Sequence, residues 1–435
     1  MLTGVNIKPW RRKREASLKI KEENYNIVIL GCCFAIFVTM IGMVNSPSSL
    51  FIVPVCDTYG FSRSSFSFTL SFSTICGIFI NLFYGKIYRR LGVRKIIALG
   101  FISGTMAFLI MWRATTLPLF YLGGLLSGFG MGLNSITTVA LLLNTWFKKR
   151  KGLLLGFVCA GSGLGGFLFS TLFTHVIVSH GYQTAYLITA VCLFLVGIPV
   201  VAFIKEKTVN RENLKKDATR LDEEYFSGFK ILLKQRNVRR TFIAAFLLGT
   251  AVHAVLVATP GHLENNGIDA ITTGTLYGAI FLVLAVAKVV LGWLNDYFGT
   301  KKAACTVLCA FIIGTTLLIF VNSVGMAWVY VIIFGMAVPS ETVLVPLIAR
   351  NVLGKKHYKE YLGMYVASLM AGLTAGVPVI NFSYDTFGTY VPALILFVAL
   401  GIVAAYLILT SVSQKKQEPQ EKPEDICTLQ VPVAK

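Results

Sequence analysis

The chain has 435 residues, of which 55% are hydrophobic and only 14% are charged, and its mean hydropathy is +0.71. Soluble domains usually have about a quarter of their residues charged, so this composition excludes a soluble globular protein. The formal net charge of +20 would suit a nucleic-acid-binding protein. The basic residues are instead dispersed between apolar segments, which argues against nucleic acid as a partner.

Apolar segments recur along the chain at the length of about 18 to 25 residues that crosses roughly 30 Å of hydrocarbon. We therefore predict an all-α membrane protein with twelve transmembrane helices, whose main partner is the lipid bilayer. The first helix is expected to run on past Pro47 with a kink, because 46–56 is still apolar. The predicted spans are 26–44, 65–84, 96–112, 117–142, 153–175, 183–204, 241–259, 273–294, 303–321, 326–349, 361–381 and 390–411.

The distribution of basic residues predicts the orientation of these spans. If both termini are cytoplasmic, 37 of the 40 Lys and Arg residues fall on cytoplasmic segments, and only Arg63, Arg113 and Lys288 do not. Cytoplasmic loops are enriched in Lys and Arg, so we expect a multi-pass protein of the cell membrane with both termini inside. The polar residues before the first span do not have the pattern of a cleaved signal.

A shift of 207 residues aligns the first half of the chain with the second. Lys95 falls on Lys302 and Asn144 on Asn351, and the loops coincide as well. The offset predicts two parallel six-helix repeats, an arrangement typical of rocking transporters. The glycine pairs are 42/249, 60/267, 85/292, 92/299, 128/335, 156/363, 165/372 and 181/388.

The predicted domain order follows from the spans and the repeat. It comprises a cytoplasmic basic N-terminus (1–25), a six-helix bundle (26–204), a cytoplasmic central loop (205–240), a second six-helix bundle (241–411) and a disordered cytoplasmic tail (412–435). The nine cysteines are scattered and do not have the spacing of a metal site or a disulfide framework. We expect a monomer without metal or cofactor, and not an enzyme.

The segment GWLNDYFGTKK, residues 292–302, resembles the loop motif of the major facilitator superfamily, with Gly292, Asp296 and Gly299 at its key positions. Its first-half counterpart, residues 85–95, keeps Gly85 and Gly92 but has Arg89 where the family usually has an acid. The resemblance implies the major facilitator fold. It also implies that Gly85, Arg89, Gly92, Gly292, Asp296 and Gly299 form a gating motif.

Segments 144–166 and 345–393 resemble the monocarboxylate and oxalate/formate branch of that superfamily. The first-span signature of animal monocarboxylate carriers is not recognisable in residues 40–51, which contain no lysine. The resemblance implies secondary transport of a small organic anion by alternating access. Lactate, pyruvate, formate and oxalate are the expected class of substrate, with proton symport, exchange and uniport left open.

Three ionisable residues lie inside the second-half spans: Lys288, Glu341 and His253. Such groups are expensive in hydrocarbon and usually functional. The resemblance implies that Lys288 binds the substrate carboxylate, because the branch commonly has an arginine there; a static or snorkelling lysine is the alternative. We hypothesise that Glu341 neutralises Lys288 in the empty protein and takes up a proton when the anion binds, unless the two form a permanent structural pair. His253 is either a proton-coupling and substrate-binding residue or a satisfied core histidine.

The remaining candidates are polar groups near these positions. Tyr277 shares a helix face with Phe281, Leu284 and Lys288, which favours a substrate contact or plain aromatic packing. The 207 offset relates Lys288 to Asn81, Glu341 to Asn134 and His253 to Ser46. We therefore add Asn45, Asn81 and Asn134 as candidate substrate ligands, with hydrogen bonds between helices as the alternative.

Other functions remain open at this level. The nearest alternative is a carrier of another amphipathic metabolite or a larger organic acid. A membrane enzyme would need a nucleophile, metal or cofactor constellation, and a transport-inactive sensor would need an added domain; the sequence offers neither pattern.

Overall fold

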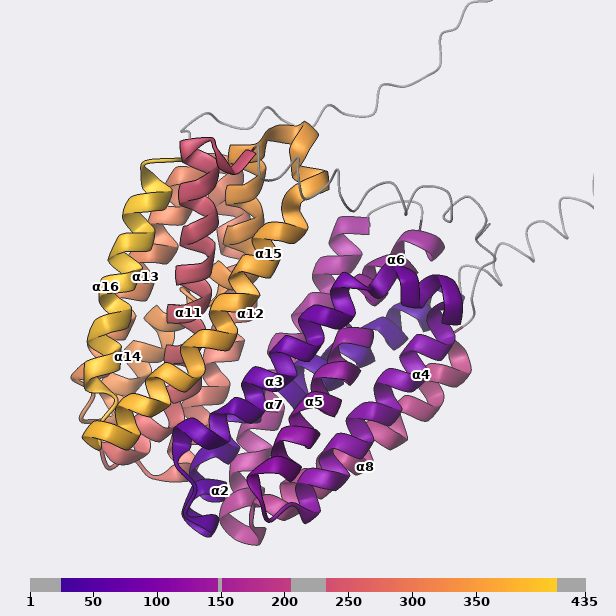
Figure 1. Cartoon of the computed structure of the whole chain (residues 1–435), viewed down its shortest axis with the longest axis vertical. Coiled ribbons are helices and arrows are strands. Elements are labelled where there is room, and N and C mark those ends of the chain that lie inside the picture. The colour runs from indigo at the N-terminus through magenta and orange to yellow at the C-terminus, as the bar shows by residue number, and fades with distance from the viewer. Residues whose placement is uncertain (1–24, 148–150, 205–231, 413–435) are drawn as a thin grey trace, which may run out of the picture.

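The computed structural model of the chain describes residues 25–147, 151–204 and 232–412 (Figure 1). Within these ranges the chain is helical and contains no strand. The predicted basic N-terminus, most of the central loop and the tail lie outside the described residues. Twelve helices are long and apolar enough to cross a membrane, which confirms the predicted number: Tyr25–Tyr59, Arg63–Asn81, Arg90–Arg113, Leu117–Leu143, Leu154–His180, Tyr182–Phe203, Arg236–Asn265, Ala270–Phe298, Thr300–Ile319, Val324–Gly354, Tyr361–Phe387 and Val391–Leu409.

Several elements depart from a simple run of straight helices. The α4 and α15 helices each turn at a glycine of positive φ, Gly92 and Gly354, so α15 holds both the end of the tenth span and the eleventh. The elements are η1 (Val38–Asn45), η2 (Ser46–Phe51), α2 (Ile52–Tyr59), α3 (Arg63–Leu82), α4 (Tyr84–Arg113), α5 (Leu117–Leu133), α6 (Ile136–Trp146), α7 (Lys151–His180), α8 (Tyr182–Phe203), α11 (Arg236–Asn265), α12 (Ala270–Phe298), α13 (Thr300–Ile319), α14 (Val324–Gly335), η3 (Ser340–Leu344), α15 (Val345–Phe387) and α16 (Val391–Leu409).

Two predicted boundaries need correction. The first span does not end at residue 44: it passes through the π-helix η1 and the 3₁₀ helix η2 and continues to Tyr59, as expected from the apolar residues beyond Pro47. Proline removes a backbone donor from the helix, and the chain tightens there instead of stopping. The helix α11 begins at Arg236, inside the segment predicted as loop over 205–240.

Twelve spans return the chain to the side where it starts, so Tyr25 and Leu409 lie at one face of the bundle. We call this the terminal face and the opposite one the far face. The far face carries the turns at Gly60, Gly181, Gly267 and Gly388.

The 207-residue repeat is present in the backbone. Gly60, Gly92 and Gly181 have φ angles of 67°, 75° and 83°, and their partners Gly267, Gly299 and Gly388 have 85°, 83° and 68°. A side chain disfavours positive φ, so glycine is retained where the chain must make these turns. The shared conformation supports two parallel repeats.

Helix packing repeats as well. A side chain on Gly128 of α5 would clash with the carbonyl of Ser73 in α3, and one on Gly335 of α14 would lie 3.4 Å from the carbonyl of Ile280 in α12, which is related to Ser73 by the same offset. Without a side chain at these positions, the helices of each pair approach closely, as is common in membranes.

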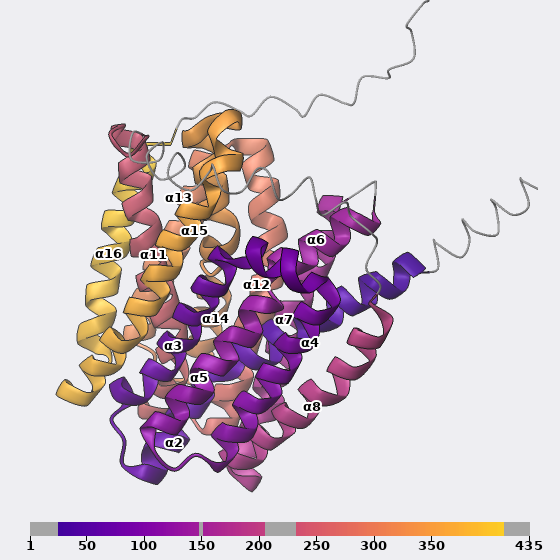
Figure 2. The ribbon, with the colours of Figure 1, turned by 45° about the vertical axis from the view of Figure 1, so that its right-hand side comes forward.

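The two six-helix units lie side by side in Figures 1 and 2, the first from indigo to magenta and the second from red to yellow. Their contacts run mainly between α7 and α12 and between α3 and α15. Leu50 of η2 packs into the core of the second half, while Val257 and Val377 pack into the core of the first. The halves are thus held together by a limited set of interface helices.

We predict that Gly128→Ala lowers the unfolding free energy by about 1–3 kcal/mol, because the added methyl group forces α3 and α5 apart. Gly156→Ala is the matched control, since a methyl group there meets no atom within 4 Å. Thermal unfolding of the two purified variants checks this. Equal stability of both variants would contradict the close α3–α5 contact.

Candidate transport site

His253 and Glu341 are two titratable groups that lie close together inside the spans. His253 Nδ1 of α11 lies 3.6 Å from Glu341 Oε1 of η3, and their side chains are 16% and 13% exposed. This distance is longer than a normal hydrogen bond but within ion-pair range. Neither atom has a hydrogen-bond partner among the described residues. The two groups therefore face each other in a largely buried environment.

A break in the tenth span places Glu341 there. The helix α14 ends at Gly335, and the chain resumes as the π-helix η3 after Pro339. The η3 segment contacts α11 and α12, which carry His253 and Lys288. Single π turns often occur at functional sites, because the extra residue per turn changes the direction of a side chain.

Lys288 of α12 is half-buried in the middle of the bundle. It interacts electrostatically with Cys159 of α7 and with Glu341 of η3. Within the described part of the chain, the Lys288 ammonium makes no hydrogen bond and no ion pair. The hypothesised Lys288–Glu341 pair is therefore not formed in this structure, where the carboxylate of Glu341 faces His253.

The interface of α7 and α12 shows where Lys288 sits. Toward the far face these helices touch, because a side chain on Gly274 would clash with Thr174 and one on Gly163 would lie 2.8 Å from Ala285 Cβ. Gly156 and Gly292 lie seven residues, or two turns, from Gly163 and Ala285 on the same helix faces.

At both of these positions an added Cβ meets no atom within 4 Å. The two helices therefore separate toward the terminal face. Lys288 lies three residues beyond the last close contact, where the separation begins.

Tyr277 lies on α12 between Lys288 and the far face, where the α7–α12 interface is closed. Its hydroxyl donates a 3.0 Å hydrogen bond to the backbone carbonyl of Ser46, and its ring meets Phe281 edge to face at 5.2 Å. Both side chains are buried, at 2% and 5% exposed. The aromatic face predicted from sequence exists, but in this conformation it packs against the first half.

The three asparagines do not join this group. Asn81 Oδ1 accepts hydrogen bonds from Ser135 and Thr137 at 3.0 and 3.2 Å, within the first half. Asn134 is fully buried beside Gly100 of α4, and its amide has no partner among the described residues. Asn45 is exposed at the end of η1. A substrate-binding role for these three asparagines stays a prediction.

The loop motif is only partly described. Gly92 turns α4, and Gly299 ends α12 with a φ of 83°. Asp296 is exposed, and its Oδ1 accepts a 3.2 Å hydrogen bond from the adjacent Asn295. Gly85 lies in the first turn of α4, and the gating role of the motif stays a prediction.

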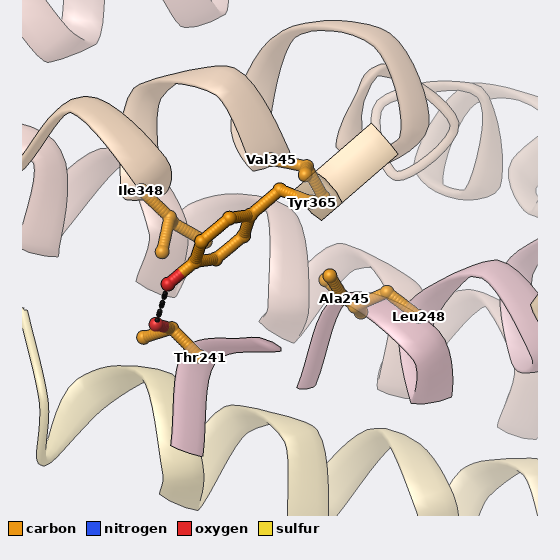
Figure 3. A pocket seen from close by; sticks show the side chains of 6 residues that line it. All are labelled: Thr241, Ala245, Leu248, Val345, Ile348 and Tyr365. Carbon is orange, nitrogen blue, oxygen red and sulfur yellow. Dashed lines mark hydrogen bonds between the residues drawn. The ribbon is translucent and has the colours of Figure 1, made fainter. Parts of the chain in front are cut away.

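A small pocket, too narrow to hold a water molecule, lies between α11 and α15 (Figure 3). Tyr365 and Thr241 on its wall share a 2.8 Å hydrogen bond, and the rest of the lining is aliphatic. Its lining contains no charged group, so Lys288, Glu341 and His253 remain the candidate transport site.

Sequence reasoning missed one charged residue. In the sequence, Arg63 was noted only as a basic residue that does not fall on a cytoplasmic segment. In the structure it is 7% exposed, and its Nη1 donates a hydrogen bond to the hydroxyl of Tyr390 in the other half. A lone arginine at the start of a span, on the side otherwise poor in basic residues, was the available signal.

Comparison with known proteins agrees with this architecture. The family model for the Major Facilitator Superfamily matches residues 31–264 and 241–433. The chain is 24% identical to an uncharacterized MFS-type transporter, YcxA of Bacillus subtilis (strain 168), over 73% of this chain and 78% of that protein. It is 23% identical to Monocarboxylate transporter 13 of Rattus norvegicus, over 80% of this chain and 81% of that protein.

Among solved structures, a mutant of the nucleoside transporter NupG superposes with a TM-score of 0.75 at 11% identity. The match covers 88% of this chain and 99% of that one. At this identity the likeness concerns the fold alone.

We predict that Asn81→Ala lowers the unfolding free energy by about 1–2 kcal/mol, because Ser135 and Thr137 lose their acceptor. Substrate affinity should stay unchanged, since these bonds lie within the first half. Thermal unfolding and the KM of uptake measure the two effects separately. A raised KM at normal stability would restore Asn81 as a substrate ligand.

Proposed function

Because the chain belongs to the Major Facilitator Superfamily, we propose that this transporter carries a small organic anion across the cell membrane by alternating access. The expected substrates are monocarboxylates or dicarboxylates of the size of lactate, pyruvate, formate or oxalate. Similarity to a protein named monocarboxylate transporter supports this class.

The observation that carries the proposal is the unpaired Lys288. An ionised side chain inside a span costs about 2.5–3.5 kcal/mol on insertion scales, so such charges usually have a partner. Lys288 makes no ion pair with any described residue, and it lies where the α7–α12 interface opens. A substrate carboxylate arriving through this opening would supply the missing counter-charge, by a charge-assisted hydrogen bond.

We further propose that the His253–Glu341 pair couples transport to a proton. At 3.6 Å the two groups attract when histidine is protonated and glutamate is not. Glu341 also interacts electrostatically with Lys288. An anion bound at Lys288 would favour protonation of Glu341, because two negative charges close together in a low dielectric repel.

We propose that the terminal face is cytoplasmic, in line with 37 of the 40 basic residues. The conformation described above, closed at the far face, is then the inward-facing one. The anion would bind to or leave Lys288 from the cytoplasmic side.

Lys288→Gln is expected to reduce kcat/KM for uptake about ten- to a hundredfold, the worth of a charged hydrogen bond. Uptake of radiolabelled lactate, pyruvate, formate and oxalate into proteoliposomes measures this. Lys288→Arg is the matched control and should retain most activity, because it keeps the charge. Full uptake of every anion by the glutamine variant would refute the anion site.

If only larger organic acids are transported and their uptake still depends on Lys288, the substrate class is wider than proposed, but the anion site remains at Lys288. Lack of uptake of any organic acid by the wild type would reject organic-anion transport itself.

Glu341→Gln should abolish the acceleration of uptake by an inward proton gradient, because the amide cannot take up a proton. Exchange of internal for external anion at equal pH should persist. Asp269→Asn, which removes a carboxylate from a loop at the far face, serves as the control. A variant that folds and keeps normal pH-driven uptake would exclude Glu341 as the coupling residue.

A further inference from the structure

A contact between the halves at the far face is built around Arg63, the first residue of α3. Its Nη1 donates a 2.7 Å hydrogen bond to the hydroxyl of Tyr390, just before α16. Its guanidinium carbon lies 3.7 Å from the ring centre of Tyr384 in α15. The cation is therefore held by two aromatic residues of the second half, with 7% of its surface exposed.

Asp385 of α15 caps the same helix from the other half. Its Oδ1 accepts from the backbone N–H of Arg63 at 2.9 Å, and its Oδ2 accepts from that of Ser64 at 2.8 Å. The first N–H groups of a helix have no partner inside it, and the helix dipole favours a negative charge there. Because the cap belongs to the second half, these two bonds last only while the far face is closed.

The repeat provides an internal comparison. Ser62 and Asp269 stand 207 residues apart, and each accepts a hydrogen bond from the third N–H of its helix, Ser65 in α3 and Thr272 in α12. Hydrogen bonding from Thr272 lowers the pKa of the exposed Asp269 carboxyl. The cap of α12 is thus local, whereas α3 has a local cap and a second one from Asp385.

The cluster is not suited to bind a substrate anion. Asp57 and Glu264 also interact electrostatically with Arg63. Asp385 adds a third carboxylate at the backbone N–H of Arg63, so an added anion would meet negative charge already present there. Two turns further along α3, Ser71 Oγ donates a 3.0 Å hydrogen bond to the Thr374 carbonyl, which extends the closed contact into the bundle.

We propose that Arg63 and Asp385 are positioning residues of the transport cycle. They hold the far face closed by capping α3 from α15 and by clamping the guanidinium between Tyr384 and Tyr390. These two residues do not touch the substrate, but they set how often the central site opens to the far face. The inference requires only the transporter fold, so it does not depend on which compound is carried.

The test measures opening directly. Ser71→Cys places a thiol at the closed interface, where the native side chain is 3% exposed. A membrane-impermeant maleimide is added to the full-length protein in detergent, and mass spectrometry quantifies labelling at position 71. Asp385→Ala should raise the labelling rate roughly two- to thirtyfold, the range of losing a helix cap. Tyr390→Phe, which deletes one hydroxyl, should raise it less.

Asp269→Ala is the matched control. It also removes a helix-capping carboxylate at the far face, but this cap bonds only its own helix and not the first half. It should leave labelling at position 71 unchanged. Unchanged labelling in both Asp385→Ala and Tyr390→Phe, in monodisperse protein, would overturn the proposal. An equal rise of the labelling rate in Asp269→Ala would also overturn the proposal. If Asp385→Ala does not fold, the labelling rate of Tyr390→Phe decides the test.

Discussion

The cost of an ionised group inside hydrocarbon governs the arrangement of this protein. Of the charged groups in the middle of the spans, Glu341 faces His253, and Lys288 makes no ion pair with a described residue. Such a cation persists only where water or a ligand reaches it. The separation of α7 and α12 beyond Gly163 and Ala285 provides that access. Charge placement and helix separation are therefore two aspects of one site.

Close contact at the far face and separation at the terminal face both depend on small residues. Gly163, Gly274 and Gly278 let α7 and α12 touch, with the side chains of Ala285 and Thr174 seated against Gly163 and Gly274. Small-residue surfaces of this kind favour rocking, because few side chains must change rotamer when the helices part. The directional contacts lie at the end of the interface, at Arg63, and at the Tyr277 hydroxyl. A few polar bonds can thus bias a surface that is otherwise easy to separate.

Hydropathy, basic-residue placement and the 207-residue offset were enough to predict the twelve spans and their repeated packing, because each depends on composition along a helix. The partner of Glu341 was not predictable in this way. Its direction depends on the π turn of Ser340–Leu344 and on the preceding break after Gly335. The offset also gave Asn134 a role by analogy with Glu341, yet Asn134 turns toward Gly100 inside the first half. Equivalent sequence positions share a backbone path more reliably than a side-chain environment.

The asymmetry between the halves has a mechanical consequence. Lys288, Glu341 and His253 all belong to the second half, while the first half contributes the Ser46 carbonyl and glycine surfaces. If each half moves as a unit, distances among the three titratable groups change little during the cycle. An anion bound at Lys288 would then keep its strongest electrostatic interactions while the first half moves across it. Separating opposite charges in a low dielectric costs much energy. Keeping the three titratable groups in one half avoids breaking an ion pair at every turnover.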